Sequence, residues 1–196
     1  MVGDTASDAH SRCKQSLQKF FEHLVRRRFI DDIRLEEPGV VRYVTDLLAD
    51  FAHTDSVYRI QDASGRPLEA VAEMLIESNP LLEASSFDRE RAVRKHVGDY
   101  TLFMTGLFPE SVAKLHQSKR PRLDAFVDYV RAGKESYKIV ACFDQFEYRD
   151  EAPLFRRLSE HFERCVVGLN LVKHDLERYQ QDYYCRWRNT LGKRPD

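Results

Sequence analysis

The chain has 196 residues, of which 42% are hydrophobic and 32% are charged, a mixture typical of a folded globular protein and too apolar for a disordered one. Lysine and arginine (31) nearly balance aspartate and glutamate (32), so the formal net charge of −1 gives no overall attraction to nucleic acid or anionic lipid. No apolar run approaches the ~18 residues of a membrane span, and residues 1–10 lack the pattern of a secretory signal. We therefore expect a cytoplasmic protein without nucleic-acid or membrane partners, folded as a single domain over residues 1–196 with frayed ends near 1–8 and 191–196.

Apolar residues recur at three- and four-residue intervals along nearly the whole chain, and no segment shows the sustained alternation of a β-strand. The spacing predicts a first amphipathic helix over residues 13–25. A second begins near Gly39 and keeps an apolar stripe as far as Tyr58. A third, shorter helix follows Pro67 and stops at Asn79.

The fourth helix, over residues 87–108, is expected to lie at the centre of the fold. Ser85 or Ser86 can cap its start, and Pro109 ends it. From Val97 to Phe108 the segment is apolar on all sides and carries one formal charge, that of Asp99. A helix of this kind belongs in the interior of a bundle.

The remaining helices complete an all-α bundle. A brief helix is expected from Pro109 through Leu115, and a sixth over residues 123–148, which Gly133 could bend or divide. A long seventh helix would begin near Pro153 and continue almost to Trp187, with Gly168 and Asn170 as points where it could kink. The prediction is a single-domain bundle of about six or seven helices.

Asp99 raises a chemical question, because an ionised carboxylate in a dry interior must find a partner or change its protonation state. Successive residues of an α-helix are rotated by about 100°, so the fourth helix has one side of small residues and one side of bulky residues. The small side lets another helix approach closely. His96, Asp99 and Tyr100 lie three or four positions apart and could share one patch.

Two other predicted helices also carry charges on their apolar stripes. Asp55 lies on the second, between Phe51 and Tyr58, and Lys134 lies on the sixth. If the three stripes face one another, a polar pocket for a small ligand forms inside the bundle, lined by His96, Asp99, Tyr100, Asp55, Tyr58 and Lys134. In the structural alternative, Asp55 pairs with Arg59, Lys134 extends from the edge of its stripe to water, and Asp99 bonds His96 or caps a neighbouring helix.

Recognisable catalytic and cofactor motifs are absent from the sequence. No Glu-x-x-His pair, H-E-x-x-H zinc motif, phosphate-binding glycine loop or nucleophile elbow occurs, and the four cysteines form no C-x-x-C pair. We therefore predict no cofactor and no metal. Aromatic and basic residues mix over residues 178–194, but three of the aromatics continue the stripe of the last helix, which favours packing over nucleic-acid binding.

The motif Gly-Asp-x-x-Leu-Phe-x-x-Gly-x-Phe-Pro, from Gly98 to Pro109, resembles a segment of uncharacterised helical proteins from bacteria. The resemblance covers this stretch and the helix before it. It implies an all-helical fold and a bacterial origin, and it supplies no activity, cofactor or catalytic residue.

Three functional hypotheses follow from the sequence. The first is a non-catalytic binding or scaffold protein with a small-ligand pocket in the bundle. The second is an enzyme in which Asp99 or Asp55 is the general base, His96 an acid or base, and Lys134 an electrostatic partner, with Tyr58 or Tyr100 as proton donor. The third is an obligate homodimer that associates through the last helix.

Overall fold

The computed structural model describes residues 17–52, 56, 57, 59–61, 65, 70–78, 86–115, 122–179, 185, 186, 188 and 189. These residues form helices and no β-strand, which confirms the all-α class. A first helix over 17–26 continues as the π-helix η1 (Arg27–Asp32). It is followed by α2 (Pro38–Phe51), α3 (Val71–Glu77), α4 (Phe87–Leu107), α5 (Pro109–Leu115), α6 (Arg122–Val140), the 3-10 turn η3 (Phe146–Tyr148), α7 (Ala152–Glu160) and α8 (Phe162–Arg178). No helix in this described part of the chain combines the length and apolar character that a membrane crossing requires.

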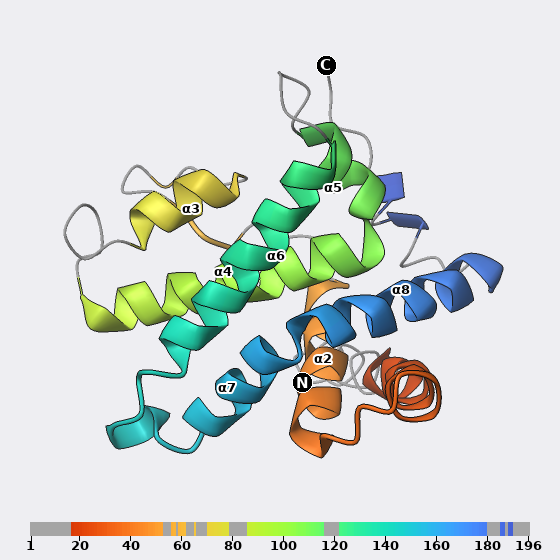
Figure 1. Ribbon diagram of the computed structural model, residues 1–196, viewed down its shortest axis with the longest axis horizontal. Coiled ribbons are helices and arrows are strands. Elements are labelled where there is room, and N and C mark those ends of the chain that lie inside the picture. Colours follow the sequence, from red (N-terminus) through yellow and green to blue (C-terminus); the bar gives the residue numbers. More distant parts are fainter. Residues whose placement is uncertain are drawn as a thin grey trace, which may run out of the picture.

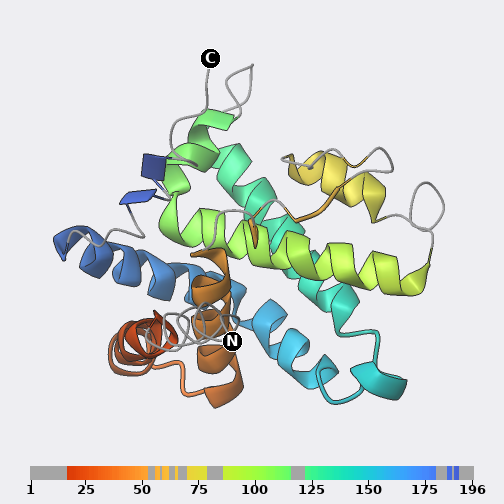
Figure 2. The ribbon, with the colours of Figure 1, turned by 180° about the vertical axis from the view of Figure 1, so that it is seen from behind.

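Helix α4 lies at the centre of the bundle, as its sequence predicts. The Ser86 hydroxyl caps its start by accepting the backbone N–H of Arg89 at 3.1 Å, and the helix ends just before Pro109. Every residue from His96 to Leu107 is buried. Helix α6 crosses α4 on one side, and α8 also packs against α4 (Figure 1). The first helix and η1 lie beside α2 and α8 (Figure 2).

Glycines mark the places where these helices come closest. A Cβ atom on Gly98 of α4 would lie 2.4 Å from the ring of Tyr137 on α6, and one on Gly106 would lie 2.5 Å from Leu169 on α8. Gly133, which we expected to bend or divide α6, instead lies inside that helix, where a Cβ would meet both Phe162 and Thr101 at 2.4 Å. The small face of α4 is therefore the face on which α6 and α8 dock.

The continuous helix expected from Pro153 almost to Trp187 is two helices in the structure. It breaks at His161 (φ −104°, ψ 16°) rather than at Gly168 or Asn170. The break allows Phe155 on α7 and Phe162 on α8 to pack against the same Tyr137 ring, with centroids 5.7 and 5.9 Å away. Gly168 stays helical, and its missing side chain makes room for Phe29 of η1.

Two other expected helices are shorter in the structure. Helix α6 ends at Val140, so Tyr148 belongs to η3 and not to the stripe of α6. Helix α2 ends at Phe51 with Ala52 as its C-cap. Asp55 and Tyr58, which we expected further along the stripe of α2, lie outside the described residues.

Candidate functional site

The Asp99 carboxylate lies inside the bundle with 5% of its side chain exposed, and side chains from three helices occupy both of its oxygens. Its Oδ1 accepts hydrogen bonds from the hydroxyls of Tyr43 on α2, at 2.6 Å, and Tyr137 on α6, at 2.8 Å. Its Oδ2 accepts from the Lys95 ammonium, one turn earlier on α4, at 3.1 Å. The buried charge is therefore paired and hydrogen-bonded, as a carboxylate in a low-dielectric interior requires.

Both tyrosines in this cluster are held in their neutral, donating form. Burial is the largest cause that raises the pKa of Tyr43 and of Tyr137 well above the ordinary value, and the negative charge of Asp99 adds to it. The ammonium of Lys95 also lies 5.1 Å from the centre of the Tyr43 ring. With 33% of its side chain exposed, Lys95 connects the cluster to solvent.

His96 belongs to a separate environment, although it is only three residues from Asp99. Its Nε2 lies 3.1 Å from the carbonyl oxygen of Val57, and the rings of Phe51 and Tyr100 lie 6.0 and 6.3 Å away. Loss of hydration on burial lowers the pKa of His96 to about 4, so the ring is neutral near pH 7 and Nε2 donates to Val57. Its Nδ1 is buried without a hydrogen-bond partner.

Four of the six residues expected to line one pocket are described, and these four do not form one group. Asp99 is bound by Lys95, Tyr43 and Tyr137, whereas His96 and the buried Tyr100 lie against each other. Lys134 forms an ion pair with Glu163 of α8 at 2.7 Å and leaves 39% of its side chain exposed. Asp55 and Tyr58, as noted above, are not described.

The partners of Asp99 that sequence reasoning missed carried weak signals. Lys95 precedes Asp99 by four residues, the spacing of a helical ion pair. Tyr137 lies on the same apolar stripe of α6 as Lys134, one turn later, so the sequence points to the correct helix and to the wrong residue. Tyr43 lies beside the apolar stripe of α2, and nothing in its own neighbourhood indicates a buried acid as its partner.

Among the grooves that described residues line on the surface, two have volumes typical of ligand sites, and neither touches Asp99. One, of about 600 Å³, lies between the first helix and α2. The other, of about 640 Å³, follows α6 beside α7 and α8. Among the described residues, no three His, Cys, Asp or Glu side chains lie close enough together to hold a metal ion.

Partly buried ion pairs between distant segments form a second group that the sequence did not predict. Arg28 of η1 donates two hydrogen bonds to Asp175 of α8, at 2.6 and 2.7 Å, and these bonds are the largest cause that lowers the pKa of Asp175. Lys173 of α8 binds both oxygens of Glu110 on α5, at 2.8 and 3.0 Å. Because each pair joins separate helices, they stabilise the arrangement of the bundle.

No family model matches this chain, and no curated protein or solved structure matches it either. Its function is therefore inferred from the geometry of its own residues.

Proposed function

We propose that this chain is a non-catalytic helical binding protein in which the Asp99 cluster holds α2, α4 and α6 together. The observation that carries the proposal is the occupation of both carboxylate oxygens by Tyr43, Tyr137 and Lys95, with 5% of the Asp99 side chain exposed. A general base needs an oxygen within hydrogen-bond reach of its substrate. A substrate that displaced Tyr137 would leave a fully buried hydroxyl unpaired, which is costly.

The groove between the first helix and α2 is the binding surface that we propose. Its volume, about 600 Å³, lies within the range of about 300–1,000 Å³ usual for ligand pockets. Val41 and Pro38 give it an apolar part, and its charged lining residues carry both signs: Lys19, Arg26, Arg42, Glu22, Glu36, Glu37 and Asp46. Such a lining suits a ligand with an apolar body and both charges, and a short peptide segment has this chemistry.

Nuclear magnetic resonance titration with a pool of short peptides that carry both charges tests this proposal. We expect shifts of the backbone amides of Lys19, Arg42 and Asp46, and loss of those shifts in Arg42→Glu. The matched control is Arg131→Glu on α6, an exposed arginine outside this groove, which should bind as the wild type does. Shifts concentrated at Tyr43, Asp99 and Tyr137 would contradict the proposal.

The enzyme hypothesis remains the second candidate because of one observation. The Lys95 ammonium contacts Asp99, and 33% of the Lys95 side chain is exposed, so movement of this one side chain would open Oδ2 to water. An enzyme that used Asp99 as its base would lose turnover in Asp99→Asn while the protein stayed folded. If Asp99 has only a structural role, the same substitution lowers the melting temperature. Peptide binding at the groove then stays intact at temperatures where the variant is folded.

A further inference from the structure

Phe146, in the connection between α6 and α7, is an unusually exposed aromatic residue. Its side chain is 90% exposed, and its backbone has φ of 50°, in the left-handed region that bulky residues rarely adopt. The connection lies at the edge of the bundle (Figures 1 and 2). The strained backbone costs free energy, and so does the exposure of a large apolar side chain to water. Features with such costs are concentrated at functional surfaces.

Contacts with α4 hold this connection firmly in place. The side chain of Arg91 is 9% exposed. Its guanidinium stacks 3.9 Å from the centre of the Tyr148 ring and forms an ion pair with Glu151 at 2.6 Å. The Tyr148 hydroxyl donates to Asp88 at 2.9 Å. The backbone N–H of Arg149 closes the turn by donating to the carbonyl of Phe146. Phe146 is therefore displayed on a fixed support, which lowers the entropic cost of binding through it.

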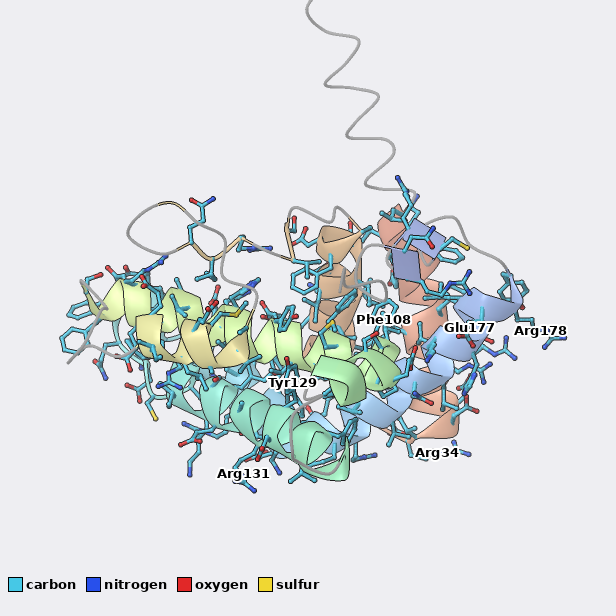
Figure 3. All side chains as sticks on the ribbon, turned by 90° about the horizontal axis from the view of Figure 1, so that it is seen from above. Arg34, Phe108, Tyr129, Arg131, Glu177 and Arg178 are labelled. Carbon is cyan, nitrogen blue, oxygen red and sulfur yellow. The ribbon has the colours of Figure 1, made fainter. Side chains whose placement is uncertain are left out.

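The groove along α6 offers a complementary surface. Its volume is about 640 Å³, and Val127, Val130 and Ile139 line it, with Val127 44% exposed. Its cations are Arg131, Lys134 and Lys138. Figure 3 shows Arg131 projecting outward from α6.

The charges of the connection and the groove are opposite in sign. Residues 144–151 contain four acidic residues against one arginine. Glu151 is paired with Arg91, which leaves Asp144, Glu147 and Asp150 against Arg149. The groove is lined by three cations and by two carboxylates, Glu135 and Glu163. Lys134 pairs with Glu163, and Arg131 lies 3.8 Å from Asp128, which is outside the lining. An acidic segment with a protruding aromatic ring thus matches an apolar groove with an excess of positive charge.

We propose that two copies of this chain associate by placing Phe146 of each copy in the α6 groove of the other. Cys142, the last residue of α6 and its C-terminal turn to line the groove, precedes Phe146 by four positions. Two copies with antiparallel α6 helices about a two-fold axis therefore bring each connection over the other's groove, and the interface closes without leading to a filament. This surface shares no lining residue with the groove between the first helix and α2.

Sedimentation velocity over a wide range of protein concentrations tests the proposal. We expect a monomer–dimer equilibrium in the wild type and a dissociation constant about 100-fold weaker in Phe146→Ser, because the side chain is used twice in each dimer. Two matched controls should dimerise as the wild type does. Phe87→Ser changes another phenylalanine that is 73% exposed, and Val167→Ser changes an exposed residue of α8, the helix through which the sequence alone suggested dimerisation.

A charge exchange tests the pairing itself. Lys138→Glu and Glu147→Lys each place like charges in both contacts of a dimer, so each variant alone should be a monomer. Mixed in equal amounts, they should form a heterodimer, because both contacts then join opposite charges. A wild type that stays monomeric at every concentration, dimerisation of Phe146→Ser at wild-type strength, or failure of the two charge variants to associate would each overturn the proposal.

Discussion

Replacing Asp99 with alanine tests whether the buried carboxylate organises the centre of the bundle. The substitution leaves the hydroxyls of Tyr43 and Tyr137 without their acceptor. Each buried hydroxyl without a partner costs about 1–3 kcal/mol. Lys95 adds little, because its ammonium is partly exposed and can turn to water. We therefore expect Asp99→Ala to lower the free energy of unfolding by about 2–6 kcal/mol, a large part of the ~5–15 kcal/mol that a domain has.

Two milder variants separate the hydrogen bonds from the charge. Asp99→Asn keeps an oxygen that can accept both tyrosine hydroxyls and loses the ion pair with Lys95, so about 1–2 kcal/mol should be lost. Tyr137→Phe removes one donor, and Asp99 keeps the bonds from Tyr43 and Lys95, which predicts a loss of about 1 kcal/mol. Glu135→Ala, which removes an exposed carboxylate from α6, is the control and should stay within about 0.5 kcal/mol of the wild type.

Guanidinium unfolding followed by circular dichroism measures these differences, provided that the slope of the transition is the same for all variants. The double variant Asp99→Ala/Tyr137→Phe should lose less than the sum of the two single losses. In this variant Tyr137→Phe removes the very hydroxyl that Asp99→Ala would leave without an acceptor. If Asp99→Ala unfolded within about 1 kcal/mol of the wild type, the cluster would not hold the helices together, and the reasoning that assigns Asp99 a structural role would fail.

Three further predictions follow from the described core. The pKa of His96 is about 4 in the folded chain and about 6.5 in the unfolded chain, so the unfolded chain binds the proton first as the pH is lowered. The free energy of unfolding should therefore fall by up to about 3 kcal/mol as the pH is lowered from 6.5 to 4. Unfolding measured at several pH values should show that His96→Gln weakens this dependence. Gly133→Ala should lose about 1–3 kcal/mol or more by overpacking, whereas Gly39→Ala, whose Cβ meets an atom only at 3.5 Å, should lose less in the same assay. Burial raises the pKa of Cys165 to about 12, so mass spectrometry after brief iodoacetamide treatment should find the exposed Cys142 modified and Cys165 unmodified until the protein unfolds.

The bounds of the central helix could be predicted because the signals that set them are local. Ser86 supplies the cap, Pro109 prevents continuation, and the apolar run between them indicates burial. The break at His161 has no such signal. Leu158, Phe162 and Cys165 continue the helical spacing straight across it, so the stripe looks the same whether the helix is continuous or divided. Packing of both flanking segments on Tyr137 decides the matter, and that contact is not local.

The candidate site was predictable only as far as helical geometry reaches. Periodicity places Asp99 in the interior and Lys95 one turn away, since both statements concern a single helix. Which side chains of α2 and α6 meet the carboxylate depends on how far those helices slide along α4. Lys134 and Tyr137 are one turn apart on the same helix, and a shift of one turn exchanges their positions opposite Asp99.

That register is fixed by a polar contact as well as by apolar packing. Gly98 lets the Tyr137 ring lie against the backbone of α4, and from there the phenol reaches the carboxylate of the next residue, Asp99. Apolar stripes tolerate many exchanges of Leu, Val and Phe if volume is kept, so they select among registers only weakly. A slip of α6 would remove the Tyr137 donor from Asp99, which keeps Tyr43 and Lys95, and would also leave the fully buried Tyr137 hydroxyl without its acceptor. A buried hydroxyl without a partner costs about 1–3 kcal/mol. The charge that looked out of place in the sequence therefore discriminates between one arrangement of α4 and α6 and its neighbours.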